Sequence, residues 1–139
     1  MSNEFEQISI KPGFMKHNGG VLFRTVSGTE YEFKTIINEN HLNAAGITHG
    51  GFIAAVVDAG AGTAAHRSAD NNPCVTISLE LKFISAVQIG QELIGKTKIQ
   101  KKTKSMVFLT CELTAGNKIV ATSSGVWKIL KLTGAGPGG

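Results

Sequence analysis

The hydrophobic residues of this chain fall into one long apolar run and several alternating runs. The long run covers residues 52–65, FIAAVVDAGAGTAA, where Asp58 is the one ionisable residue. Alanine is the best helix former, and the run is too long for an ordinary strand, so the pattern predicts a helix. A helix that is apolar on every side is expected to be buried on every side. Gly60 and Gly62 weaken such a helix, and they would let another backbone approach it closely.

Shorter runs before and after the helix predict strands. Residues 21–26 and 30–38 flank Ser27-Gly28, which is typical of a β-hairpin. After the turn signal at 70–73, residues 75–84 alternate strictly. The apolar positions of that run are Val75, Ile77, Leu79, Leu81 and Phe83, and the polar positions are Thr76, Ser78, Glu80 and Lys82. The alternation therefore predicts that Thr76 lies on the polar face of its strand, away from the helix, unless a β-bulge near Pro73 changes its direction.

The remaining segments complete an α+β fold in which an antiparallel sheet curls around one central helix. Residues 91–101, 105–115 and 118–131 predict three more strands, the last two joined by a turn at Gly116-Asn117. We expect a single domain over residues 1–133 and a flexible Gly-rich tail at 134–139. Residues 1–18 are weakly patterned and suggest a helical turn or an irregular cover.

Composition sets outer bounds on the function. The chain has 139 residues, of which 42% are hydrophobic and 17% charged, as expected of a globular protein. Cys74 and Cys111 are too few for a disulfide framework and are expected to be reduced core residues. No signal peptide or membrane span is visible, so we expect a cytoplasmic protein without a membrane partner. The net charge of +4 suits anionic ligands without specifying one.

Candidate chemistry is concentrated around the predicted helix. Asp58 has no cationic residue within a helical turn, so it either bonds backbone elsewhere or is a catalytic carboxylate in a dry site. At the helix start, Gly50-Gly51 would allow a ligand oxygen to approach unpaired backbone N–H groups, which is a suitable oxyanion site. The histidines and cysteines lack metal-site spacing, and neither a phosphate-binding glycine motif nor a G-x-S-x-G elbow is present.

The pattern Asn43…Gly46…His49-Gly50-Gly51…Asp58 resembles that of the hotdog-fold acyl-CoA thioesterases. Within them it is most similar to the branch of the phenylacetate-pathway enzymes and thioesterase superfamily member 2. The resemblance implies a hotdog fold whose subunits pair edge to edge, as a dimer or a dimer of dimers. It also implies hydrolysis of acyl-CoA thioesters, with coenzyme A as part of the substrate and no metal or redox cofactor.

The same resemblance implies a role for each matching residue. Asp58 corresponds to the catalytic carboxylate, a general base or nucleophile, and Gly50 to the residue whose N–H polarises the thioester carbonyl. Asn43 and His49 correspond to side chains that support that part of the site, and Thr76 to a hydroxyl that assists the carboxylate. Gly50 and Asp58 are about 12 Å apart along a helix. We therefore expect each site to combine Asn43, His49 and Gly50 of one subunit with Asp58 and Thr76 of its partner.

Five lysines crowd the predicted strand pair over residues 91–115, namely Lys96, Lys98, Lys101, Lys102 and Lys104. One interpretation is a solvated sheet edge that resists aggregation. The other is a patch for coenzyme A phosphates, for which Lys102 and Lys104 best match the family, although Thr103 stands where glycine is common. No aromatic stacking pattern accompanies the lysines, so a nucleic acid partner is not expected.

Two other activities remain open. Some hotdog proteins bind acyl-CoA without cleaving it, and an aspartate kept for packing would suit that role. A hotdog hydratase pairs its aspartate with a nearby histidine, whereas His49 and Asp58 are far apart along the predicted helix, which argues against hydration. Aryl-acetyl, benzoyl and medium-chain acyl groups are all compatible with the sequence.

Overall fold

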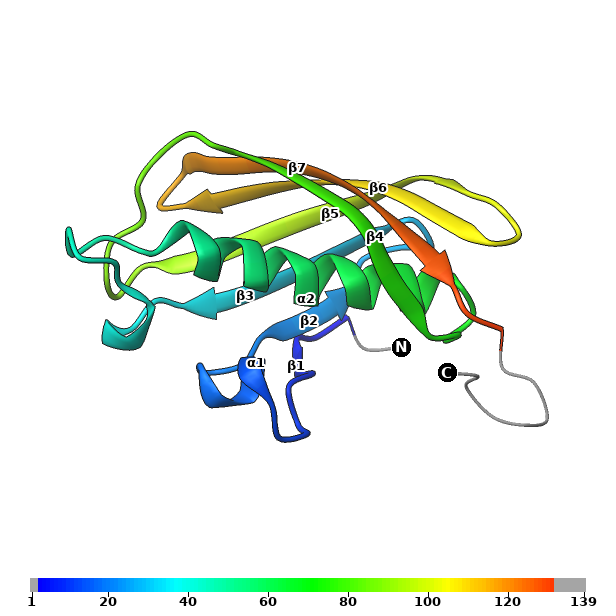
Figure 1. The fold of residues 1–139 in the computed structure, drawn as a ribbon, viewed down its shortest axis with the longest axis horizontal. Coiled ribbons are helices and arrows are strands. Elements are labelled where there is room, and N and C mark those ends of the chain that lie inside the picture. Colours follow the sequence, from blue (N-terminus) through cyan, green and yellow to red (C-terminus); the bar gives the residue numbers. More distant parts are fainter. Residues whose placement is uncertain (1–2, 132–139) are drawn as a thin grey trace.

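A computed structural model describes residues 3–131, in which a seven-stranded antiparallel sheet curls around one long helix (Figure 1). In chain order the elements are β1 (Glu6–Gln7), α1 (Phe14–His17), β2 (Leu22–Thr25), β3 (Glu30–Ile36), a 3-10 turn (Glu39–His41), α2 (Gly50–Ser68), β4 (Cys74–Phe83), β5 (Glu92–Lys102), β6 (Met106–Ala115) and β7 (Lys118–Ile129). The predicted hairpin, central helix and four following strands are confirmed. The helical turn expected near the N-terminus is α1, while β1 was not predicted, and the tail 134–139 lies outside the described residues.

The core lies between α2 and the concave face of the sheet. Side chains of α2, among them Val56, Val57 and Ala61, are fully buried against sheet residues that include Phe33 and Trp127. Gly60 and Gly95 leave room for the ring of Phe33, since a Cβ on either glycine would lie 2.3 Å or 2.2 Å from its atoms. The close approach that we predicted at Gly60 is therefore made by an aromatic ring and not by a second backbone.

The sheet covers only part of the helix circumference. Gly51 and Asp58 are exposed, and Ala54, Ala55 and Gly62 are only partly buried. The expectation that α2 is buried on every side is therefore wrong for the single chain. A strip of small residues on α2 remains open, with Asp58 in it.

The strand order is β1-β2-β3-β5-β6-β7-β4, so β5 is an interior strand and β4 is an outermost one. The interpretation of the lysines as a sheet edge is wrong for Lys96 and Lys98, which lie where β5 is paired on both sides. Lys96 and Lys98 are exposed on the convex face of an interior strand, and Lys102 ends β5 beyond its last pair with β3, Glu30↔Lys98. The edge of the sheet next to α2 is instead formed by β4.

Strand β4 does not keep the alternation of its sequence. Thr76 pairs with Trp127 and Ser78 with Val126, so Ile77 is an extra residue that forms a β-bulge. Before the bulge Thr76 faces the helix, and Val75 and Ile77 are 43% and 55% exposed. The predicted position of Thr76 on the polar face is therefore wrong, because the bulge reverses the face on which residues before it lie.

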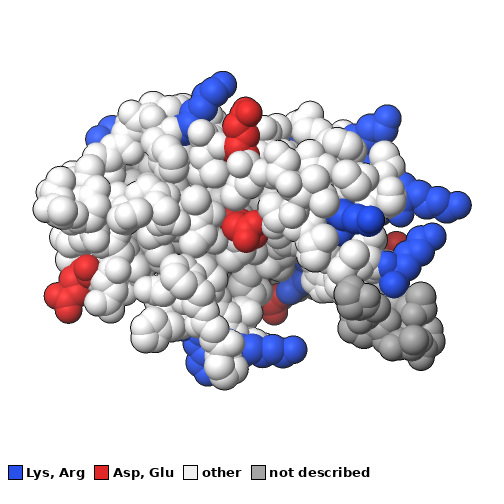
Figure 2. Space-filling view, in the orientation of Figure 1, with Lys and Arg blue, Asp and Glu red and all other residues white. Residues whose placement is uncertain are grey.

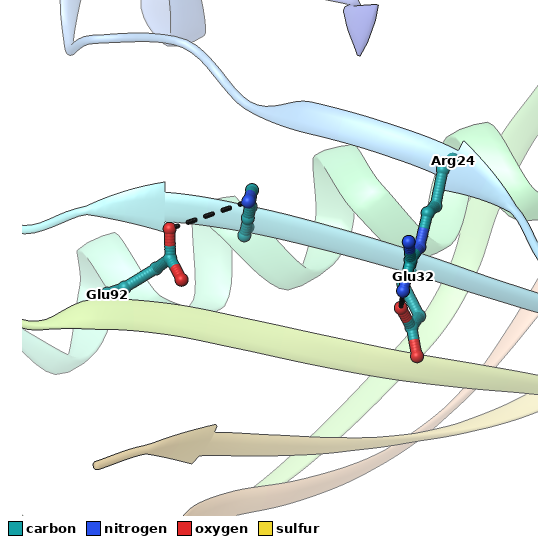
Figure 3. A network of polar contacts seen from close by, with 4 residues as sticks. Arg24, Glu32 and Glu92 are labelled. Atoms are coloured by element: carbon teal, nitrogen blue, oxygen red, sulfur yellow. Dashed lines mark hydrogen bonds and ion pairs between the residues drawn. The ribbon is translucent and has the colours of Figure 1, made fainter. Parts of the chain in front are cut away.

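The convex face carries polar side chains across β2, β3 and β5. Arg24 of β2 is paired with Glu32 of β3, and Lys34 of β3 lies 3.6 Å from Glu92 of β5 (Figure 3). These partly exposed pairs contribute little stability each, but they show which face of the sheet carries charge. Within residues 3–131, no helix is long and apolar enough to cross a membrane.

Candidate active site

The loop before α2 is held in one conformation by its own polar groups. The Asn43 Oδ1 accepts from the N–H groups of Ala45 at 2.9 Å and Ile47 at 3.3 Å. Gly46 has φ +79°, a left-handed conformation that glycine adopts without strain, and its N–H donates to the Asn43 carbonyl at 3.0 Å. The amide nitrogen of the Asn43 side chain makes no bond to residues 3–131, so it is available to a ligand.

His41 attaches this loop to the body of the protein. Its Nδ1 accepts from the Asn38 N–H at 3.0 Å, and its Nε2 donates to the Asn18 carbonyl at 2.6 Å. The ring stacks on Phe52 at a centroid distance of 3.6 Å, and the His41 carbonyl accepts from the His49 N–H. His41 is 2% exposed with both ring nitrogens engaged, so it is a structural histidine.

His49 is the N-cap of α2. Its Nδ1 accepts from the Gly51 N–H at 2.8 Å, which occupies one of the donors at the start of the helix. A Cβ on Gly51 would lie 2.9 Å from that nitrogen, so glycine is required there to admit the histidine ring. In this structure His49 is therefore the cap that fixes the first turn of α2.

The N–H of Gly50 remains free at the start of α2. The Gly51 N–H is bonded to His49, and the Phe52 N–H donates to the His49 carbonyl, whereas the Gly50 N–H has no acceptor in the described chain. It is an unpaired donor at the positive end of a helix of 19 residues. The ring of Phe83 lies beside Gly50, and a Cβ added to Gly50 would be 3.5 Å from that ring.

Asp58 is hydrogen-bonded to Thr76 across the gap between α2 and β4. The Thr76 Oγ1 donates to the Asp58 Oδ1 at 2.7 Å. Both residues are exposed in the single chain, so the dry environment expected for Asp58 is not present in one subunit. The contact exists because the bulge at Ile77 turns Thr76 toward the helix.

A hollow of about 390 Å³ opens beside this pair. Its walls are formed by Asp58, Ala59, Gly62, Thr63, His66, Pro73, Cys74, Thr76 and Trp127. This volume lies within the ordinary range for a small-molecule site. Burial raises the pKa of the Cys74 thiol above its usual range, which disfavours the thiolate as a nucleophile in this hollow.

The structure divides the predicted site residues into two groups. Asn43, His49 and Gly50 lie together at the N-terminal end of α2, and Asp58 and Thr76 lie together near its middle. Because about 12 Å of helix separates Gly50 from Asp58, the two groups do not meet on one thioester within this chain.

Basic side chains lie on the other side of the 72–74 segment from the Asp58 hollow. A second hollow, of about 230 Å³, is lined by Lys102, Lys104 and Lys131 together with Asp70, Asn72 and three further residues. Lys102 donates from Nζ to the Ser68 carbonyl at 2.7 Å, so part of its role is to bond the C-terminal end of α2. Lys and Arg side chains gather at this end of the molecule (Figure 2).

Sequence reasoning missed His66, Trp127 and Lys131 as candidate ligand contacts. His66 directly follows the apolar run 52–65 and Trp127 lies in an ordinary strand pattern, so neither residue carried a sequence signal of ligand binding. Only the pairing of β4 with β7 brings Trp127 beside Thr76. Among residues 3–131 no three His, Cys, Asp or Glu side chains converge on a point where they could hold a metal ion.

Known proteins similar to this chain are thioesterases. The model of the thioesterase superfamily matches residues 45–122. A Pseudomonas aeruginosa protein provisionally named as an esterase is 34% identical over 94 residues, which cover 67% of this chain and 70% of that protein. Mouse acyl-coenzyme A thioesterase 13 is 30% identical over 78 residues, which cover 56% of each chain. The crystal structure of zebrafish thioesterase superfamily member 2 superposes with a TM-score of 0.77 at 22% identity, covering 87% of this chain and 89% of that one.

The fold and the matched region together define a hotdog thioesterase. The chain belongs to the thioesterase superfamily, and the resemblance stated from the sequence is confirmed. It is a thioester hydrolase.

Proposed function

We propose that this chain hydrolyses acyl-CoA thioesters, with Asp58 of one subunit and the Gly50 N–H of a second subunit acting on the same carbonyl group. The observation that carries the proposal is the hydrogen bond from Thr76 to Asp58, which fixes the carboxylate at the rim of the hollow. The name of the mouse relative supports coenzyme A as the thiol component of the substrate.

The subunits pair along the side on which α2 and β4 are open. The small residues of α2 leave room for a second backbone, and β4 is a ten-residue outer strand with unpaired backbone groups. Exposed apolar side chains continue along it, including Ile77, Phe83 and Ile84 at 55–57% exposure. A second copy packed here would cover Asp58 and bring its own helix start toward it. Pairs of such dimers would form a tetramer.

In the reaction, the oxygen of a water molecule bonds to the thioester carbonyl carbon while Asp58 takes its proton. Alternatively, the Asp58 carboxylate attacks the carbonyl carbon directly, and water then hydrolyses the resulting anhydride. Both routes need Asp58 in the same position beside the carbonyl group. The Gly50 N–H of the partner subunit stabilises the oxyanion, and Thr76 holds the carboxylate. The carbon–sulfur bond then breaks, and the sulfur takes a proton to leave as the thiol of coenzyme A.

The experiment that tests the proposal is thiol release from aryl-acetyl, benzoyl and medium-chain acyl-CoAs by wild type and Asp58→Asn. The amide keeps the size of the carboxylate and removes the base, so kcat should fall by about 10²-fold or more. Equal cleavage by both proteins would contradict the role of Asp58. Binding of acyl-CoA without any thiol release by the wild type would favour the non-catalytic alternative.

The lysine hollow is proposed to hold the phosphates of coenzyme A. Lys102 and Lys104 were predicted for this role, and Lys131 joins them in lining the hollow. The Lys104 side chain has no partner within residues 3–131, so its charge is available.

We expect Lys104→Ala to raise KM for an acyl-CoA by about two- to fivefold, the size of an exposed ion pair. KM for the acyl-pantetheine with the same acyl group should not change, because that substrate lacks the phosphates. Lys98→Ala is the matched control, since it removes an exposed lysine of β5 that does not line the hollow. Equal KM changes for both substrates would contradict a phosphate contact.

A further inference from the structure

The indole N–H of Trp127 is an unused donor in the wall of the Asp58 hollow. The side chain is 1% exposed, yet its Nε1 donates to no acceptor in the part of the chain that the structure describes. A Cβ on Gly62 would lie 3.3 Å from this nitrogen, so the absence of a side chain at Gly62 leaves the N–H uncovered. The indole nitrogen is therefore reachable although the rest of the ring is buried, which makes this N–H a candidate for ligand binding.

His66 also lines this hollow, as well as a second one beside β1, and its ring carries a free acceptor. Its Nδ1 lies 2.8 Å from the Asn72 carbonyl oxygen, which only accepts, so Nδ1 carries the hydrogen in the neutral ring. The Nε2 then presents a lone pair, and it has no partner within residues 3–131. The residues that line the Asp58 hollow thus include Trp127, which carries a free donor, and His66, which carries a free acceptor.

These two groups lie between the proposed reaction centre and the proposed phosphate site. Gly62 and His66 follow Asp58 on one face of α2 at intervals of four residues, about 6 Å and 12 Å along its axis. The hollow that they line ends at Pro73 and Cys74, and the lysine hollow begins at Asn72. A ligand that joins the Asp58–Thr76 pair to the lysines passes Trp127 and His66.

We propose that Trp127 and His66 hold the amide groups of the pantetheine arm of coenzyme A, an inference that rests on the proposed function. The arm carries two secondary amides between its sulfur and its phosphates. An amide oxygen accepts from the Trp127 Nε1–H, and an amide N–H donates to the His66 Nε2. Gly62 serves as the residue that keeps the indole N–H accessible.

The test compares two thioesters of one acyl group, the pantetheine thioester and the ethanethiol thioester, which has no amide. Gly62→Ala places a methyl group against the indole nitrogen and favours the helix by about 1 kcal/mol, so folding should survive. We expect kcat/KM for the pantetheine thioester to fall about tenfold, because the hydrogen bond from the indole N–H to the amide is lost. The kcat/KM for the ethanethiol thioester should change less than about twofold. Trp127→Phe should act in the same way.

The control is Thr63→Ser, which changes the wall of the same hollow by one methyl group and leaves the indole open. It should preserve the preference for the pantetheine thioester. Equal losses for both thioesters in Gly62→Ala and Trp127→Phe would overturn the inference, since they would show a packing effect alone.

Fluorescence separates this inference from the proposed function, because Trp127 is the one tryptophan in the sequence. Coenzyme A and pantetheine should both shift its emission, and adenosine bisphosphate should not. If no acyl-CoA is hydrolysed but these shifts occur, the proposed function fails and the binding of the arm stands. If hydrolysis occurs and pantetheine leaves the emission unchanged, the arm does not contact Trp127.

Discussion

At the scale of single residues, the position of the Asp58 carboxylate depends on Thr76. A helix side chain that points into an open hollow has several rotamers, and the 2.7 Å bond from Thr76 selects one of them. Both side chains are exposed in the isolated chain, so this bond has its full strength only where a second surface excludes water. We therefore expect Thr76 to act on catalysis by positioning the carboxylate.

Thr76→Val tests this role, because valine keeps the branched shape and removes the hydroxyl. We expect kcat to fall by about 10- to 100-fold, the range for a hydrogen bond to a charged group. Thr76→Ser retains a hydroxyl and should stay within about threefold of wild type. Thiol release and the melting temperature would be measured for both variants; a full loss in Thr76→Ser with an unchanged melting temperature would contradict a role for the hydroxyl.

At the scale of elements, the start of α2 is built so that one donor stays free. The His49 cap bonds the Gly51 N–H, the loop held by Asn43 leads the chain into the helix, and the Gly50 N–H is left over. Gly50 is the first residue of the helix, where proline is favoured because its missing N–H has no partner in a helix anyway. His49 before it has φ −65° and ψ 130°, which the residue preceding a proline adopts readily.

Gly50→Pro should consequently remove the oxyanion donor and leave the helix intact. We predict a fall in kcat of about 10²- to 10³-fold, as for other single oxyanion donors, with an unchanged circular dichroism spectrum. Gly50→Ala is the matched control, because it adds a Cβ in ordinary contact with Phe83 and keeps the N–H. Activity of the proline variant close to that of the alanine variant would exclude the Gly50 N–H from catalysis.

The periodicity of the sequence was sufficient to predict the central helix and strands β2 to β7, but neither β1 nor the face of β4. The central helix and the strands follow from local propensity, and the free donor follows from the position of Gly50 at a helix start. The bulge at Ile77 leaves no local signal, because the alternation of 75–84 is unbroken in sequence and the extra residue is defined only by pairing with β7. Trp127 and His66 were missed for the same reason, since tertiary pairing brings them to one hollow.

At the scale of the whole molecule, the proposal requires each subunit to hold two incomplete halves of a site. The apolar run predicted the central helix correctly but not the side of it that the sheet of the same chain leaves uncovered. Asp58 lies on the part of α2 that its own sheet leaves open, beside the outer strand β4. The separation of about 12 Å between Gly50 and Asp58 is bridged only if a second subunit contributes one of them.

The most direct measurement is complementation between two inactive variants, Asp58→Asn and Gly50→Pro, co-expressed with different affinity tags. If each site combines Asp58 of one subunit with Gly50 of its partner, a mixed dimer contains one intact site and one with both changes. Random pairing in a symmetric dimer then restores about one quarter of wild-type thiol release, and purified mixed dimers about one half. If both groups act within one chain, every site in the mixed dimer carries one change, and activity stays at the level of the separate variants. That result would contradict the composite site.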